Sequence, residues 1–185
     1  MVRWPLGLFL CQRNYALEIV DECGLLGSKL VDFPIDENHK LALAKGQNPD
    51  DPSRQHRLVG RLIYLTITRP ELCYAVCILS QFMQAQKEEH MDTARRVLRY
   101  IKATPGYGIL LRSDSNLQIH AYCDADWAAC PLTRRSLTGY LVTLGGSPVS
   151  WQTKKQTTVS CSSAEVEYRS MAATTSEPVW LKSFL

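Results

Sequence analysis

Two pairs of acidic side chains are the residues of this 185-residue chain best suited to chemistry. Asp124 and Asp126 end an alternating segment that predicts a strand, and Glu165 and Glu167 lie in the first turns of a predicted helix. Residues two apart share one face of a strand, whereas helical residues two apart diverge by about 200°. Both aspartates can therefore face one metal site, but only one of the two glutamates can join them there.

Carboxylate oxygens are the ligands that Mg²⁺ prefers, and two such ions about 4 Å apart can activate a water and stabilise the leaving oxygen of a phosphodiester. A structural interpretation is equally compatible with the spacing, because aspartates cap turns and glutamates favour the start of a helix. Spacing alone leaves both interpretations open.

The hydrophobic periodicity predicts the elements that position these carboxylates. Helices are expected over residues 14–23, 54–67, 70–83, 88–102 and 162–185, and strands over 8–12, 109–111, 117–123, 137–144 and 149–153. Gly145 and Gly146 predict a hairpin turn between the last two strands. Pro178 predicts a kink or break of the last helix near Glu177.

Composition narrows the class of protein. No apolar run approaches the ~18–20 residues that span a bilayer, so we do not expect a membrane protein. The apolar run from Leu6 to Cys11 is too short for a signal peptide and is interpreted as a strand, so an intracellular location, cytoplasmic or nuclear, is expected rather than secretion. The seven cysteines form no Cys-x-x-Cys pair, which favours neither zinc nor a disulfide framework.

Charge is distributed unevenly although the net charge is only +3. Residues 54–102 carry nine Lys and Arg against four Asp and Glu, a net of +5. This middle segment is therefore the part best suited to face phosphates, although solvated helix faces carry the same residue types.

Several sequence blocks resemble, in order and spacing, the ribonuclease H region of copia-type retrotransposon Pol polyproteins. They are residues 122–128, 133–136, 139–140, 150–151, 154–156 and 162–168. Upstream, residues 10–16, 58–65, 68–70 and 96–102 are similar to the end of that family's reverse transcriptase and its connection to the ribonuclease H. The resemblance covers essentially the whole chain.

This resemblance implies an α/β fold with a truncated ribonuclease H-like half, made of three antiparallel strands and one helix, preceded by a helical connection segment. The domains expected are a reverse transcriptase palm remnant (1–28), a linker (29–53), a helical thumb or connection (54–107) and an incomplete ribonuclease H-like domain (108–185). One strand of that half is expected to have an open edge, which predicts marginal stability and self-association.

The resemblance also implies hydrolysis of RNA in RNA–DNA hybrids by two Mg²⁺ ions. Matched position by position, Asp124 and Glu167 are the catalytic metal ligands, while Asp126 and Glu165 have supporting roles. Packing roles are expected for Tyr122 and Trp127. Candidates for phosphate contacts are Arg95, Arg99, Lys102, Arg134, Arg135, Lys154 and Lys155. The polymerase Tyr-x-Asp-Asp motif is absent and two further nuclease carboxylates are expected outside the chain, so neither active site is expected to be complete.

Two alternative functions remain. A non-catalytic nucleic-acid-binding module would use the basic residues Arg54, Arg57, Arg61, Arg95, Arg99 and Lys102. A secreted effector is suggested by Arg96-Val97-Leu98-Arg99, which matches an Arg-x-Leu-Arg tag. A functional tag lies in a flexible region, whereas this one falls inside a predicted helix, so the effector interpretation is disfavoured.

Overall fold

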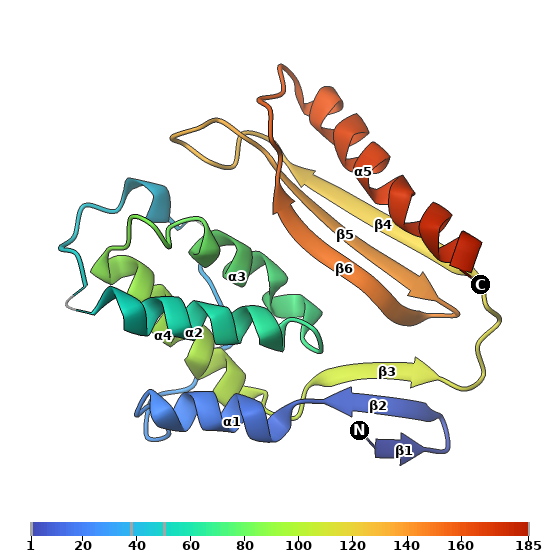
Figure 1. Cartoon of the computed structure of the whole chain (residues 1–185), viewed down its shortest axis with the longest axis horizontal. Helices are drawn as coiled ribbons and strands as arrows, with labels where there is room; N and C mark the ends of the chain where they lie inside the picture. Colours follow the sequence, from blue (N-terminus) through green and yellow to red (C-terminus); the bar gives the residue numbers. More distant parts are fainter. Residues whose placement is uncertain (1, 38, 50, 185) are drawn as a thin grey trace. The chain divides into compact units, whose positions relative to one another are not determined.

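The computed structural model describes residues 2–37, 39–49 and 51–184, and the chain divides into two compact units (Figure 1). The helical unit comprises residues 11–108, and the sheet unit comprises residues 1–10 and 109–185. The α/β class expected from the sequence is confirmed, because helices and antiparallel sheets are both present.

The helical unit contains α1 (Arg13–Glu22), α2 (Pro52–Leu65), α3 (Cys73–Ser80) and α4 (Glu88–Ala103), with the short 3-10 helices η1 (Leu41–Leu43) and η2 (Pro70–Leu72). The helices predicted over 14–23, 54–67 and 88–102 are confirmed to within two residues at each end. The helix predicted over 70–83 begins at Pro70 as predicted, but it ends at Ser80, so the prediction of its last three residues is wrong. It starts as η2, and after Ser80 the chain turns so that the Phe82 ring stacks on His90 with 4.4 Å between ring centroids.

Local signals explain where the two long helices of this unit begin. The Asp51 carboxylate accepts the backbone N–H of Arg54 at 3.2 Å, and Pro52 occupies the first turn of α2, where its missing N–H costs nothing. At the start of α4, Nδ1 of His90 accepts the backbone N–H of Lys87 at 2.9 Å. Its Nε2 therefore carries the proton and donates to the carbonyl oxygen of Leu41 at 3.0 Å.

In the segment predicted as a linker over 29–53, the described residues (29–37, 39–49 and 51–53) are irregular apart from η1 and the start of α2. Ile35 and Leu41 within it are nevertheless buried, and the Gln47 carbonyl accepts the N–H of Glu88 at 3.0 Å. These contacts attach the segment to the helical unit. The predicted domain boundaries stay predictions.

The sheet unit contains two three-stranded sheets. The first has the order β1 (Val2–Trp4), β2 (Gly7–Cys11) and β3 (Gly108–Arg112), and the second has the order β4 (Ile119–Asp126), β5 (Leu137–Leu144) and β6 (Ser147–Lys155). The sequence did not predict β1, because three residues are too few to show a period. The predicted hairpin is confirmed, since Gly145 and Gly146 join β5 to β6 with φ of +54° and +77°.

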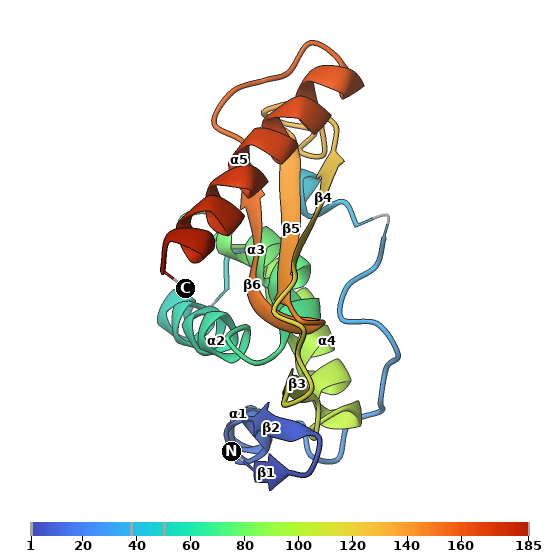
Figure 2. The same cartoon turned by 90° about the vertical axis from the view of Figure 1, so that its right-hand side faces the viewer.

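Helix α5 (Ser163–Phe184) covers one face of the second sheet, over β4 and β5 (Figures 1 and 2). The prediction of three antiparallel strands followed by one helix is confirmed. The break predicted at Pro178 is wrong, because α5 continues through this residue to Phe184. Contacts with the sheet hold α5 just before the proline, since Thr174 is buried and the Glu177 carboxylate accepts the Ser150 hydroxyl at 3.2 Å. In the part of the chain that the structure describes, neither α5 nor any other helix combines the length and apolarity of a membrane span.

Arg69 is the largest fully buried side chain of the helical unit, with 1% of its surface exposed. Its guanidinium pairs with Glu71 and donates to the carbonyl oxygen and hydroxyl of Thr104 at 2.9 and 2.7 Å. The rings of Tyr100 and Tyr107 lie 5.8 and 5.3 Å from the guanidinium carbon. One side chain thus joins η2 to the end of α4, and a buried charge of this kind needs every one of these partners.

We expect Arg69→Met to lower the free energy of unfolding by about 3 kcal/mol, because Thr104 and Glu71 lose a charged donor. Arg95→Met is the matched control, since Arg95 forms its ion pairs with Glu88 and Asp92 at the surface and should contribute less than about 1 kcal/mol. Urea unfolding of both variants measures the difference. Equal midpoints for the two variants would contradict the assigned role of Arg69.

Candidate functional site

The second sheet has two chemically different faces. Asp124 pairs with Gly139, and Ala125 pairs with Thr138, so the two successive β4 residues point to opposite faces. We call the face that bears Tyr122, Asp124 and Asp126 the carboxylate face. The other face, which bears Thr138 and Tyr140 and is covered by α5, we call the helix face.

The amide of Gln156 fixes α5 to the helix face. Its Nε2 donates to the Thr138 hydroxyl at 3.0 Å and to the Val166 carbonyl at 3.3 Å, while its Oε1 accepts the Ser160 hydroxyl at 3.3 Å. Val166, which is a residue of α5, is itself fully buried. The sequence did not predict that Gln156 joins β5 to α5, because its neighbours Lys154 and Lys155 are equally typical of a surface glutamine.

A second hydrogen bond joins α5 to the strand that carries the first candidate metal ligand. The hydroxyl of Ser170, which is fully buried, donates to the backbone carbonyl of Asp124 at 3.0 Å. Glu167 lies one turn before Ser170 on the same side of α5. This hydrogen bond therefore places the turn of α5 that carries Glu167 next to β4, the strand that carries Asp124.

Both carboxylates of the candidate pair are exposed to solvent. Asp124 projects from the carboxylate face, whereas Glu167 belongs to the helix on the opposite face. β4 is an edge strand of the described sheet, so its outer edge is not paired with another described strand. Within residues 2–37, 39–49 and 51–184, no three His, Cys, Asp or Glu side chains gather closely enough to hold a metal ion.

Glu165 has a structural role. Its Oε2 accepts the backbone N–H of Cys161 at 2.7 Å, and its own N–H donates to the Ser162 hydroxyl at 3.2 Å, so both N–H groups are paired at the start of α5. The N–H of Cys161 and the guanidinium of Arg169 lower the pKa of the Glu165 carboxyl. Glu165 thus helps to hold the start of α5, where the Ser162 hydroxyl caps the helix.

Asp126 shares the carboxylate face with Asp124, at the last position of β4. The packing role expected for Tyr122 is wrong, because its side chain on the same face is 59% exposed. Trp127 is also half exposed, but its indole Nε1 donates to the Ser160 carbonyl at 3.2 Å and so ties the end of β4 to the segment before α5.

The basic candidate residues differ in whether their charged groups already form ion pairs or hydrogen bonds within the protein. Arg95 pairs with Glu88 and Asp92, and the Lys102 ammonium donates to the Ser28 carbonyl at 2.6 Å. Arg61 pairs with Glu18 and Glu22. In contrast, Arg134 and Arg135 are exposed in the loop between β4 and β5. The loop arginines therefore keep more of their charge for an external phosphate than Arg61, Arg95 and Lys102 do.

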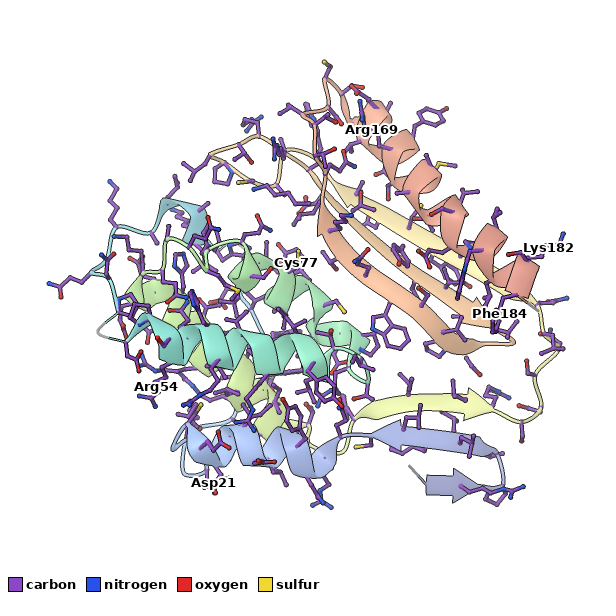
Figure 3. All side chains as sticks on the ribbon, viewed as in Figure 1. Asp21, Arg54, Cys77, Arg169, Lys182 and Phe184 are labelled. Carbon is purple, nitrogen blue, oxygen red and sulfur yellow. The ribbon has the colours of Figure 1, made fainter. Side chains whose placement is uncertain are left out.

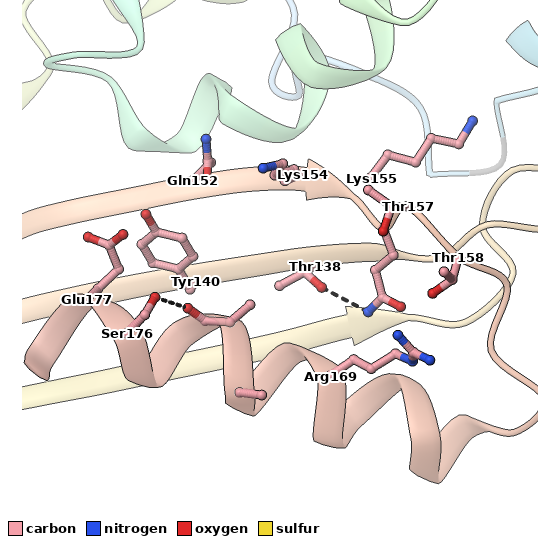
Figure 4. A pocket seen from close by; sticks show the side chains of 13 residues that line it. Thr138, Tyr140, Gln152, Lys154, Lys155, Thr157, Thr158, Arg169, Ser176 and Glu177 are labelled. Atoms are coloured by element: carbon pink, nitrogen blue, oxygen red, sulfur yellow. Dashed lines mark hydrogen bonds between the residues drawn. The ribbon is translucent and has the colours of Figure 1, made fainter.

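A cavity of about 520 Å³ lies between α5 and the helix face (Figure 4). Lys154 on β6 and Arg169 on α5 line it from opposite sides, and Glu177 lies at its far end. Figure 3 shows Arg169 near the start of α5 and Lys182 and Phe184 near its end. Strand alternation separates this cavity from the carboxylate face by the thickness of the sheet, so it is not part of the candidate metal site.

Cys130, in the loop between β4 and β5, has an unusual environment that the sequence did not reveal. Burial by itself would raise its pKa, but the Thr133 hydroxyl, the Lys155 side chain and the N–H groups of Thr133 and Leu132 outweigh burial and lower the pKa of this thiol to about 7. Cys73 shows the opposite balance, since burial raises its pKa to about 11.

We expect iodoacetamide to alkylate Cys130 near neutral pH, where its thiolate is already abundant, and to leave Cys73 largely unmodified. The Cys130 rate should rise with pH through about 7 and then level off, because the thiolate is the nucleophile. Peptide mass mapping at several pH values measures both sites. Lys155→Met should shift the Cys130 midpoint to higher pH, and an unchanged midpoint would contradict the assigned contact.

Comparisons with known proteins show the family of the chain. It is 45% identical over 183 residues to a retrovirus-related Pol polyprotein from transposon RE1 of Arabidopsis thaliana, which covers 99% of this chain and 12% of that protein. An uncharacterized mitochondrial protein of Arabidopsis thaliana is 43% identical over 95% of this chain and 73% of its own length. The chain belongs to the family of retrovirus-related Pol polyproteins of copia-type transposons. It spans about an eighth of the length of the transposon polyproteins it matches.

A further relative bears on the Arg-x-Leu-Arg pattern. A protein of Plasmopara viticola named secreted RxLR effector protein 161 is 44% identical over 124 residues, which cover 66% of this chain and 87% of that protein. In the present structure Arg96-Val97-Leu98-Arg99 lies inside α4, with Val97 and Leu98 fully buried. No protein-family model and no solved structure matches the chain.

Proposed function

We propose that this chain is the segment of a retroelement polymerase–nuclease that supplies Asp124 and Glu167 to a Mg²⁺-dependent ribonuclease H site acting on RNA in RNA–DNA hybrids. The observation that carries the proposal is the hydrogen bond from Ser170 to the Asp124 carbonyl, which holds the helix of one carboxylate against the strand of the other. Sheet β4–β5–β6 with α5 is, on this proposal, a ribonuclease H-like half.

The donor set is compatible with magnesium. Mg²⁺ usually keeps several waters and takes one or two protein carboxylates together with phosphate oxygens of a substrate. Asp124 and Glu167 provide two such carboxylates at the free edge of β4, and Asp126 lies two residues from Asp124 on the carboxylate face. When bound, the ions would activate a water and stabilise the leaving oxygen of the phosphodiester. The protein's own part is to hold the two carboxylates at the edge of a rigid sheet.

Contacts to the sugar–phosphate backbone are assigned to the exposed loop arginines. Arg134 and Arg135 follow the end of β4, beyond Asp126 on the chain, so a strand that reaches the carboxylates also passes this loop. Lys154 projects from the helix face and serves this contact less directly. These interactions are electrostatic, and hybrid binding should therefore weaken as salt increases.

We expect Mg²⁺ to strengthen binding of a fluorescein-labelled RNA–DNA hybrid by the full chain, because the hybrid's phosphates complete the coordination that two carboxylates begin. Asp124→Asn and Glu167→Gln should each lower the Mg²⁺ affinity by at least about tenfold, since each variant removes a charged ligand. Fluorescence anisotropy over a Mg²⁺ titration measures the loss.

Glu165→Gln is the matched control, because the glutamine oxygen still accepts from Cys161 and the helix cap is retained. Its Mg²⁺ dependence should equal that of the unaltered chain. An equal loss in Glu165→Gln and Glu167→Gln would overturn the assignment of Glu167. Robust cleavage of the hybrid by the unaltered chain would contradict the proposal that this segment supplies only part of the site.

A further inference from the structure

Gly139 lies in the middle of β5, directly opposite Asp124 on one side and Thr153 on the other. Its backbone does not adopt the left-handed conformation that favours glycine, and a Cβ added to it would meet no atom within 4 Å. Neither backbone geometry nor packing therefore requires glycine at this position. Glycine within a strand lowers stability, and it often marks a place where a ligand approaches the backbone closely.

Other glycines of the sheet unit have a visible reason. Gly7 has a φ of +145°, and a Cβ there would collide with the backbone of Leu111. Gly145 has a φ of +54° in the hairpin turn, where a Cβ would collide with Ser115. At Gly7 and Gly145 the absence of a side chain prevents a clash. At Gly139 it prevents no clash and leaves free surface.

This free surface adjoins the candidate metal ligand. Residues directly opposite in antiparallel strands point to the same face, so the missing Gly139 side chain leaves a recess beside the Asp124 carboxylate. Tyr122 flanks the recess on the same face, about 7 Å along β4 from Asp124. Its ring is 59% exposed and makes no ring contact within the described residues. A recess, a carboxylate and an exposed aromatic ring are thus adjacent.

We propose that a nucleic-acid strand runs along the carboxylate face, with its sugar–phosphate backbone over Gly139 beside Asp124 and the neighbouring base or ribose stacked on Tyr122. This inference rests on the proposed function, because the phosphate over Gly139 is the one that shares a cation with Asp124. A side chain at position 139 would occupy the space that the phosphate needs. Stacking on Tyr122 is independent of base identity, since every base presents a π-face.

Gly139→Ala tests the recess in the full chain. The added methyl group meets no protein atom, so the thermal midpoint should be unchanged or higher, whereas affinity for a fluorescein-labelled RNA–DNA hybrid in Mg²⁺ should fall at least about fivefold from overpacking against the strand. Gly60→Ala in α2 is the matched control, because a Cβ there also meets nothing within 4 Å. That variant should bind the hybrid as the unaltered chain does.

Tyr122→Ala and Tyr122→Phe test the stacking. Loss of the ring should weaken hybrid binding about 5- to 150-fold, whereas phenylalanine keeps the π-face and should bind nearly normally. If Gly139→Ala lowers the thermal midpoint, the two Tyr122 variants still test the proposal. Their folding should be little affected, because the Tyr122 ring is exposed. Equal binding by the alanine and phenylalanine variants would then overturn the proposal.

The outcomes separate this inference from the function on which it rests. If the unaltered chain binds the hybrid in a manner that depends on Mg²⁺ and Asp124, but Gly139→Ala binds equally well, the path over Gly139 is overturned and the proposed function stands. If the unaltered chain binds no hybrid, both are overturned. A selective loss in Gly139→Ala and Tyr122→Ala, with Gly60→Ala unaffected, supports the strand's path.

Discussion

The attachment of α5 to the second sheet is the constraint on which the candidate site depends. Gln156 links β5 to the first turns of the helix through Thr138 and Val166, and Ser170 links the next turn to the Asp124 carbonyl. Because both bonds lie in buried or half-buried surroundings, leaving either partner unpaired would cost the full desolvation of a polar group. These two contacts fix the turn of α5 that carries Glu167 and thereby set its position relative to β4.

Because successive strand residues point to opposite faces, the two faces of the second sheet bear different kinds of side chain. One face carries the exposed row of Tyr122, Asp124 and Asp126, and the other carries the side chains that pack beneath α5 or line the cavity beside it. A one-residue shift in the β4–β5 register would move Asp124 under the helix and leave its charge buried. The Gly145-Gly146 turn and the β5–β6 pairing fix the adjacent register, and the helix face selects the register of β4.

In the helical unit, charges serve mainly to hold the fold together. Arg69 is buried against Thr104, and Arg95 is neutralised by acidic neighbours on its own helix. The excess of basic residues over 54–102 therefore overstates the free positive charge of this segment. In the β4–β5 loop, by contrast, Arg134 and Arg135 are exposed and form no ion pair among the described residues.

The sequence by itself determined the α-helices and the strands β2 to β6 to within a few residues, the Gly-Gly hairpin and the family of the chain, because these depend on short-range periodicity and on residue identity. By spacing alone the sequence did not determine which of Glu165 and Glu167 is structural, and it did not reveal the hydrogen bond that Glu165 accepts from Cys161. Nor did it show that α5 would continue through Pro178 or that Tyr122 would be exposed. Only the tertiary structure decided these, because packing against β4 and β5 and the pairing register assign partners to residues far apart in the chain.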